Sequence, residues 1–375
     1  MGDPANIDIG WRSALMLAVC MPLLMAALLL LTRKIERRAN FWLALLLLAA
    51  LVAQVPQIIG FANAYTVWPG LTFAPFDVEL YIGPLIYLHA YRLMQAGPLV
   101  WRKWIIVPGV MQTTYYVWAF TMLGDYKSKW VYTGAVHDRY IAPIETVLGV
   151  AFIVIAIIAV FRLMLRYNHF LTTTQSAAIE FRPDWLRYLL VAIIGAGIVF
   201  AGLEITPFFV KDISYVAEFP AQIVMTTIVA WAGFEAIART NTDFPKMPAS
   251  GDINEAIEQS SETKDWAQEG EFLKARIIGG KWYLEPRLSI ADLARRMGSN
   301  ETYISRALNQ GLDQSFNAFI NALRVDEAKK FIAGDKLNML EIAHESGFNS
   351  KATFNRVFRD IAGMTPSTFK KSQNQ

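Results

Sequence analysis

Long apolar runs alternate with short polar segments along the first 240 residues of the chain. Each run is near 20 residues, and a helix of about that length crosses a hydrocarbon core of about 30 Å. The pattern therefore predicts a bundle of seven transmembrane helices. Their predicted ranges are 13–32, 41–61, 78–96, 104–124, 141–163, 185–206 and 217–238.

The pattern changes after the last apolar run. Residues 264–375 carry 17 basic and 13 acidic side chains, almost as many as the 17 and 14 of residues 1–240, in less than half the length. Residues 241–263 are acidic and rich in Pro and Ser, a composition typical of a flexible tether. We therefore expect an integral membrane domain at 1–240 that acts as a sensor, an acidic linker at 241–263 and a soluble domain at 264–375.

The short loops between the predicted spans differ in their content of Lys and Arg, which favour the cytoplasmic side of a membrane. Basic residues gather after the first, third and fifth spans, at Arg33, Lys34, Arg37 and Arg38, at Arg92, Arg102 and Lys103, and at Arg162, Arg166, Arg182 and Arg187. Lys127, Lys129 and Arg139, after the fourth span, oppose this trend. The balance predicts an N terminus outside the cell and a C-terminal domain in the cytoplasm.

The soluble domain contains an internal repeat. The segment "SIADLARRMGSNETYISRAL" (289–308) is similar to "NMLEIAHESGFNSKATFNRVF" (338–358), and Gly298 recurs 49 positions later as Gly347. Each half has the pattern of a helix, a glycine-containing turn and a second helix, which predicts two helix-turn-helix units near 289–309 and 338–362. Residues suited to cap these helices stand at the expected places: Ser289 with Asp292, Asn338 with Glu341, Asn300 and Ser350.

The second helix of each unit is predicted to have one apolar and one polar face. The apolar residues at helical spacing, which we expect to pack inward, are Ile304, Ala307, Leu308, Phe354, Val357, Phe358 and Ile361. The opposite faces offer Glu301, Thr302, Ser305 and Arg306 in the first unit, and Lys351, Ala352, Asn355 and Arg356 in the second. Arg can bind guanine edges or phosphates, Asn can pair with adenine, and small residues allow close approach to a DNA groove.

Residues 315–332, "SFNAFINALRVDEAKKFI", join the two units and have apolar positions at helical spacing. A helix of 18 residues is about 27 Å long at 1.5 Å per residue. Such a helix could hold the two units about one DNA turn, roughly 34 Å, apart. One chain could therefore contact two successive major grooves.

Residues 269–372 resemble the C-terminal domain of AraC/XylS-type bacterial transcription regulators. The resemblance rests on "LSIADLARRMGSNETYISRALNQ", "SFNAFINALRVDEAKKFI" and "IAHESGFNSKATFNRVFRDIAGMTPSTFK". It implies a bacterial inner (cell) membrane for the spans, and groove-facing roles for Thr302, Ser305, Arg306, Lys351, Ala352, Asn355 and Arg356. Glu301 departs from the neutral or basic residue usual near the start of such a helix. The resemblance does not reach the membrane half.

Four glutamates near the ends of predicted spans are candidate ligand-binding residues: Glu79, Glu145, Glu204 and Glu218. Charged groups at membrane depth are costly and are functional candidates by default, although hydrated helix ends are the alternative explanation here. Cys20 is the only cysteine, and no residues stand at metal-ligand spacing, so the sequence predicts neither a metal nor a cofactor. No catalytic motif has its required context, and we expect no enzymatic activity.

These features predict a membrane-anchored, sequence-specific DNA-binding transcription regulator, in which a signal sensed by the transmembrane bundle changes promoter binding. The expected partners are double-stranded promoter DNA, membrane lipid and an unidentified small-molecule or envelope signal, with pairing into a homodimer left open. One alternative is a membrane transporter or receptor with a C-terminal regulatory or scaffolding module. Another is release of the soluble domain by proteolysis within the linker.

Overall fold

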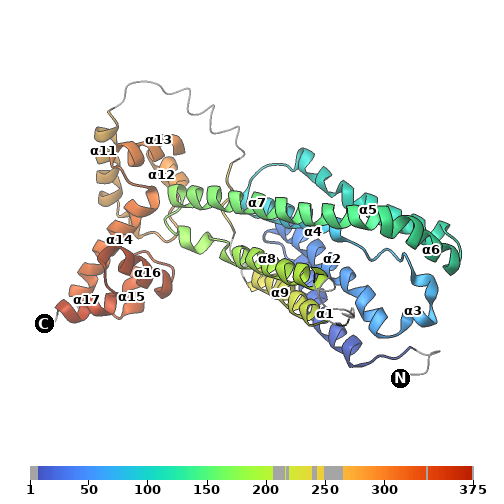
Figure 1. The fold of residues 1–375 in the computed structure, drawn as a ribbon. Coiled ribbons are helices and arrows are strands. Elements are labelled where there is room, and N and C mark those ends of the chain that lie inside the picture. Colours follow the sequence, from blue (N-terminus) through green and yellow to red (C-terminus); the bar gives the residue numbers. More distant parts are fainter. Residues whose placement is uncertain are drawn as a thin grey trace. The chain divides into compact units, whose positions relative to one another are not determined.

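Two compact units make up the chain. The computed structural model describes residues 7–205, 216, 219–238, 243–248, 265–334 and 337–373. The first unit comprises Met1–Met164 and Pro183–Lys246, and the second comprises Leu165–Arg182 and Met247–Gln375. Apart from one isolated β-bridge, the regular elements of the described residues are helical (Figure 1). The prediction of an all-α protein is confirmed.

A helix lies at each of the seven predicted apolar ranges. These helices are α1 (Trp11–Thr32), α2 (Arg37–Phe61), α4 (Glu79–Met94), α5 (Val107–Met122), α7 (Ala142–Thr174), α8 (Asp184–Ile205) and α9 (Phe219–Ala238). Shorter helical elements join them: α3 (Ala64–Val67), η1 (Pro69–Leu71), η2 (Val100–Ile106), α6 (Tyr126–Tyr132), η3 (Thr133–Ile141) and η4 (Ala178–Phe181). Within the described residues, four helical stretches are long and apolar enough to cross a membrane: Trp11–Thr32, Arg37–Phe61, Tyr126–Thr174 and Phe219–Ala238.

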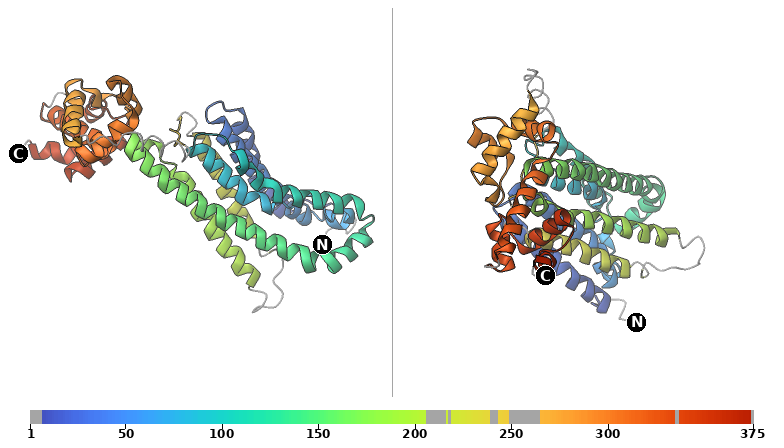
Figure 2. Two further views of the ribbon diagram at one scale, coloured as in Figure 1. Left: turned by 90° about the horizontal axis from the view of Figure 1, so that it is seen from above. Right: turned by 90° about the vertical axis from the view of Figure 1, so that its left-hand side faces the viewer.

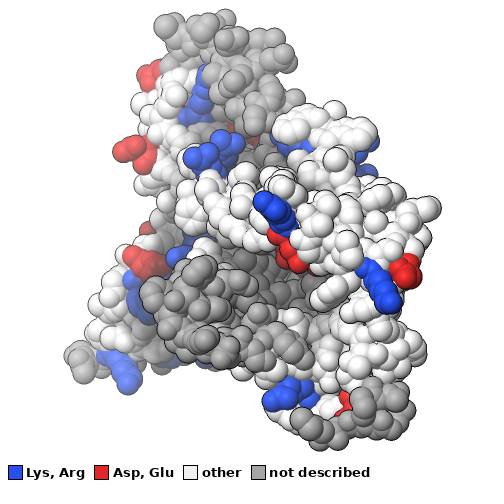
Figure 3. All heavy atoms as spheres, turned by 45° about the vertical axis from the view of Figure 1, so that its right-hand side comes forward, with Lys and Arg blue, Asp and Glu red and all other residues white. Residues whose placement is uncertain are grey.

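The helices of the first unit have apolar side chains both between them and on their outer faces. α1, α2 and α9 pack against one another, α4 packs against α2, and α8 against α9 (Figure 2). On α1, Leu23 is fully buried, whereas Met21, Met25 and Leu28 are each more than half exposed. Charged side chains are sparse among the described residues on the face drawn in Figure 3. Large exposed apolar surfaces are rare in soluble monomers but are the normal exterior of membrane-spanning helices.

An ion pair fixes the segment that follows α9. Lys246 Nζ lies 2.5 Å from Glu36 Oε2 and donates to the Leu93 carbonyl oxygen at 2.8 Å. Phe244 N donates to Glu36 Oε1 at 3.1 Å. Burial raises the pKa of the Glu36 carboxyl and lowers that of the Lys246 amine, because the loss of water outweighs the attraction between the two groups. The pair therefore positions this segment more than it stabilises the fold.

The second unit has two hydrophobic cores that share one helix. Its elements after residue 264 are α11 (Trp266–Gly279), η7 (Trp282–Leu284), α12 (Ile290–Met297), α13 (Glu301–Arg306), η8 (Ala307–Gly311), α14 (Phe316–Ala333), α15 (Met339–Glu345), α16 (Lys351–Ala362) and α17 (Pro366–Gln373). Phe316 and Ile320, in the first half of α14, pack with buried residues of α11, α12 and α13. Val325 and Ile332, in its second half, pack with those of α15 and α16.

A glycine with positive φ closes the turn between α12 and α13 and the turn between α15 and α16. Gly298 has φ 62° and Gly347 has φ 86°, a region that glycine enters without the steric cost of a side chain. At Gly347, a Cβ atom would also lie 2.8 Å from the Leu284 carbonyl oxygen. The glycine that recurs in the sequence repeat therefore has the same conformational role in both halves.

One predicted inward position is wrong. Ile361 is 44% exposed, although Phe354, Val357 and Phe358 of the same helix are buried as predicted. The inward place in the last turn of α16 is taken by Ala362, which packs against the core four residues beyond Phe358. Periodicity alone did not distinguish Ile361 from Ala362, because both lie within one turn of Phe358.

Both predicted capping boxes are confirmed. In the second, Asn338 Oδ1 accepts from Glu341 N at 3.0 Å, and Glu341 Oε2 accepts from Asn338 N at 2.8 Å. We expect Asn338→Ala to destabilise α15 by about 1 kcal/mol and to speed its amide exchange by about fivefold. Hydrogen-exchange mass spectrometry of the full-length protein measures this, with the exposed Gln314→Ala as control. Equal exchange in the two variants would contradict the capping role.

Candidate DNA-binding interface

Side-chain caps fix where α13 and α16 begin; we call these two the reading helices. Asn300 Oδ1 accepts from Tyr303 N at 2.7 Å, and Ser350 Oγ accepts from Thr353 N at 3.2 Å. Both caps were predicted from the sequence and are confirmed. Because a cap orders the first helical turn, the polar side chains of that turn have a defined direction.

The residues predicted to face DNA lie on the accessible side of each reading helix. Ile304 on α13 and Phe354 on α16 are fully buried and face the two cores. The predicted residues are exposed or half-buried: Thr302, Ser305, Arg306, Lys351, Ala352, Asn355 and Arg356. Each helix thus has the polar, accessible face that the proposed contacts require.

The first reading helix is held against α11. Tyr303 Oη donates to the Glu269 carboxylate, and burial together with that carboxylate raises the pKa of Tyr303 to about 12. The Arg306 guanidinium lies 5.9 Å from the centroid of the Trp266 ring. α11 therefore supports Arg306 at the edge of the accessible face.

The two reading helices differ in charge. On α16, Lys351, Arg356 and Arg359 are exposed, and Asp360 is the only acidic residue of the helix. α13 has Arg306 but begins with the exposed carboxylate of Glu301. Basic side chains account for most nonspecific attraction to the phosphate backbone, so α16 offers the stronger electrostatic contact.

Comparisons with known proteins agree with this geometry. A family model described as a helix-turn-helix domain matches residues 293–372. An uncharacterized HTH-type transcriptional regulator of Staphylococcus aureus (strain COL) is 29% identical over 83 residues, which are 22% of this chain and 11% of that protein. The Msm operon regulatory protein of Streptococcus mutans serotype c (strain ATCC 700610 / UA159) is 24% identical over 84 residues, 22% of this chain and 30% of that protein. No solved structure matches this chain.

Residues 293–372 are therefore an AraC-type helix-turn-helix domain, the DNA-binding part of a class of transcription regulators that are typically not enzymes. The matched stretch is about a tenth of the first relative's length, 11%, and it includes none of the helices α1 to α9.

The structure brings two of the four candidate ligand-binding glutamates together in the first unit. Glu79 begins α4, and its side chain lies against Gly149 of α7. Glu145 stands one helical turn before Gly149, and its Oε2 accepts from Tyr116 Oη of α5 at 3.0 Å. Three helices thus converge on this carboxyl pair.

A cavity of about 780 Å³ opens beside the pair. Tyr116 lines it together with Asp77, His137 and Asp138, and further aromatic side chains complete the wall: Tyr65, Phe73, Phe76, Tyr126 and Trp130. Within the described part of the chain, no Lys or Arg lines the cavity. Carboxylates and aromatic faces together suit a positively charged ligand.

The other two candidate glutamates cannot be placed beside this cavity. Glu204 falls within α8, but its side chain, like residue Glu218, lies outside the described residues. Among the residues that are described, no group of three or more His, Cys, Asp or Glu side chains is arranged to hold a metal ion.

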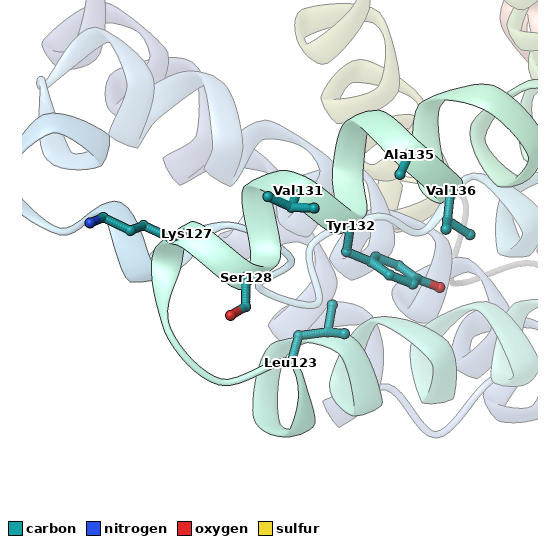
Figure 4. A pocket seen from close by; sticks show the side chains of 7 residues that line it. All are labelled: Leu123, Lys127, Ser128, Val131, Tyr132, Ala135 and Val136. Carbon is teal, nitrogen blue, oxygen red and sulfur yellow. The ribbon is translucent and has the colours of Figure 1, made fainter.

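A second hollow, of about 550 Å³, lies where α5 is followed by α6 (Figure 4). Leu123, near the end of α5, points toward the helix that carries Val131 and Tyr132. Most side chains around it are apolar, and few of them could orient a polar ligand. We assign no role to this hollow.

Two groups of residues that make contacts between distant segments were not predicted from the sequence. Tyr116 was not singled out, because its carboxylate partner is on another helix. Asn317, Asn321 and Arg324 were also missed, although their spacing of four and three residues places them on one face of α14. That polar stripe, in the part of the helix before its charged residues, was the available signal.

Proposed function

We propose that this chain is a membrane-anchored, sequence-specific DNA-binding transcription regulator of the bacterial inner (cell) membrane. Seven helices within residues 1–240 span the membrane, residues 241–263 form the tether, and residues 264–375 bind promoter DNA. One observation carries this proposal: an AraC-type helix-turn-helix domain and four helical stretches long and apolar enough to cross a membrane occur in the same chain.

Two helix-turn-helix units, near 289–309 and 338–362, bind DNA together. The contacts with bases and phosphates come from Thr302, Ser305 and Arg306 on α13, and from Lys351, Ala352, Asn355 and Arg356 on α16. α14 has 18 residues, a length of about 27 Å at 1.5 Å per residue. This length supports binding of the reading helices in successive major grooves, roughly 34 Å apart.

The N terminus lies outside the cell and the DNA-binding domain lies in the cytoplasm. The distribution of Lys and Arg supports this orientation. A second support is that Leu165–Arg182, the end of α7 and the loop after it, belongs to the same compact unit as the C-terminal residues. Segments that pack together must lie on the same side of the membrane.

Alkaline phosphatase fusions test the orientation, because this enzyme is active only outside the cytoplasm. A fusion after Asn63 should be active, and one after Gly97 should be inactive. The opposite pattern would reverse the proposed topology.

The cavity beside Glu79 and Glu145 is the site where we propose that the signal binds. Its carboxylates and aromatic walls fit an organic cation. A ligand that binds one arrangement of the helices more tightly shifts the population toward that arrangement, and so changes promoter binding.

Genome-wide DNA occupancy of the tagged full-length protein tests the proposed function as a whole. We expect discrete promoter peaks from protein that remains full-length in the membrane fraction. If only a shorter soluble fragment occupied the promoters, release by proteolysis would explain the regulation better than binding by the membrane-anchored protein. Absence of peaks under conditions of expression would refute DNA regulation and favour a transporter or receptor.

We expect Glu145→Gln to reduce the signal response by about tenfold, because the hydrogen bond that orients Tyr116 at the cavity loses its charged acceptor, and such a bond contributes roughly 1.5–3 kcal/mol. The measurement is a reporter at an occupied promoter, compared with and without the growth condition that changes it. Thr146→Ala is the matched control on α7, since its hydroxyl only donates to the Ala142 carbonyl oxygen. If Glu145→Gln and Thr146→Ala reduced the response equally, Glu145 would have no specific role in sensing the signal.

A further inference from the structure

The loop between α7 and α8 is docked on the DNA-binding domain. Leu165–Arg182 belongs to the second unit, and Ser176, Ala178 and Phe181 within it are almost fully buried. Ser176 N donates to the Leu288 carbonyl oxygen at 3.0 Å, and Gln175 forms an isolated antiparallel bridge with Ser289. Figure 1 shows the end of α7 and η4 beside the C-terminal helices. The segment before the first helix-turn-helix unit therefore pairs with this loop.

The polar stripe on α14 binds the same loop. Asn317 Nδ2 donates to the carbonyl oxygens of Gln175 and Ser176, at 3.0 and 2.7 Å. Asn321 Nδ2 lies 3.4 Å from the Ser176 carbonyl oxygen. Arg324 Nη2 donates to Ser176 Oγ at 3.2 Å. Three side chains on one face of α14 thus converge on a single residue of the loop.

The far end of the loop reaches the second helix-turn-helix unit. Glu180 Oε2 accepts from Asn349 Nδ2 at 3.0 Å and from Arg287 Nε at 3.4 Å. Ile179 packs against the hydrophobic core that contains Phe354. Because Asn349 is two residues before Lys351, the first residue of α16, the carboxylate lies near the start of a reading helix.

The chemistry of this contact suits docking that can be reversed. The groups of α14 that face the loop are amides and a guanidinium, which water can solvate when the loop leaves. Arg324 keeps its hydrogen bonds to the Tyr283 and Glu285 carbonyl oxygens, which come from its own domain. These two hydrogen bonds of the domain do not depend on the loop.

We propose that the α7–α8 loop is the joint through which the membrane helices control the DNA-binding domain, and that docking of this loop opposes DNA binding. This inference rests on the proposed function. The loop contacts α14 and the approaches to both helix-turn-helix units, so a shift of α7 and α8 reaches both reading helices. Docking also pairs the Glu180 carboxylate with Arg287, which neutralises a basic side chain that would otherwise attract DNA phosphates.

A disulfide tests the joint in the full-length protein. Residues paired in an antiparallel bridge have Cβ atoms about 4.5–5.5 Å apart, close to the geometry of a disulfide. Gln175→Cys plus Ser289→Cys should therefore cross-link under mild oxidation in lipid nanodiscs. The oxidised protein should bind an operator, identified by occupancy mapping, at least about tenfold more weakly than the same sample after reduction. Both redox forms carry Ser289→Cys, so the loss of the Ser289 cap affects them equally.

Release of the loop should have the opposite effect. Asn317→Ala plus Asn321→Ala removes the amides that bind the loop, and we expect severalfold tighter operator binding than in the wild type. Gln314→Ala removes an exposed amide near the start of α14 and should leave the affinity unchanged.

The outcomes separate this inference from the proposed function. Failure to cross-link, or equal operator affinity of the oxidised and reduced forms, would overturn the joint while leaving DNA regulation intact. If Asn317→Ala plus Asn321→Ala weakened operator binding, the proposal that docking of the loop opposes DNA binding would be wrong. If neither redox form bound any DNA, the proposed function itself would fail, and the joint with it.

Discussion

Replacing both Arg306 and Arg356 by alanine in the full-length chain should abolish specific promoter occupancy. A good bidentate contact between Arg and a base discriminates by about 1–3 kcal/mol, so losing two contacts lowers affinity by roughly a hundredfold or more. Both substitutions lie on accessible faces, and neither removes a core side chain. Chromatin immunoprecipitation at the mapped promoters and binding of the purified protein to an operator measure the effect.

The matched control removes two positive charges from α14. Lys329 and Lys330 are paired with Asp326 and Glu327 on the same helix. Lys329→Ala plus Lys330→Ala should change occupancy only slightly, because each lysine is paired with a carboxylate of its own helix. Unchanged occupancy in the arginine variant, or equal loss in the lysine variant, would show that α13 and α16 do not bind DNA as proposed.

The parts of the second unit that could be predicted from the sequence are those set by neighbours along the chain. The capping boxes at Ser289 and Asn338 join residues three positions apart, and their residue types have few other uses at that spacing. The turns at Gly298 and Gly347 require positive φ, which restricts the choice of residue. Such features are local, so a pattern in the sequence identifies them.

The contacts that could not be predicted join distant segments. Asn317 and Ser176 are 141 positions apart, and nothing in the loop itself indicates that its backbone carbonyls would be bound by α14. The same holds for Tyr116 and Glu145, which meet only because α5 and α7 converge. Glu145 was a candidate because burying its charged carboxylate at membrane depth is costly. The identity of its partner, however, depends on how the helices pack.

Both groups of distant contacts are made by polar side chains. In the first unit, carboxyls and aromatic residues gather at the cavity where we propose that the signal binds. In the second, amides and a guanidinium bind a loop that connects α7, the helix of Glu145, with α8. Polar contacts of this kind are individually weak and exchangeable with water, which suits the proposed control by a ligand.

Loss of the buried Arg324 should destabilise the C-terminal domain. Arg324 is 1% exposed, and burial lowers the pKa of its guanidinium to about 10, so it remains charged at neutral pH. Its Nε donates to the Tyr283 carbonyl oxygen and its Nη2 to the Glu285 carbonyl oxygen, both at 2.7 Å. Arg324→Met keeps much of the volume but removes the buried donor to the Tyr283 carbonyl oxygen and leaves the Glu285 carbonyl oxygen with Leu288 N alone, at an expected cost of about 2–4 kcal/mol.

Pulse proteolysis of the full-length protein in membrane vesicles measures this cost as the urea concentration at which residues 265–373 become cleavable. A loss of about 2–4 kcal/mol lowers that midpoint by roughly 1–2 M for a domain of this size. Arg359→Ala, on the exposed side of α16, should shift the midpoint little. Equal midpoints for the two variants would mean that the buried guanidinium is dispensable for folding. Arg324 also donates to Ser176 Oγ, so a lower midpoint would mean that a residue of the proposed joint stabilises the domain as well.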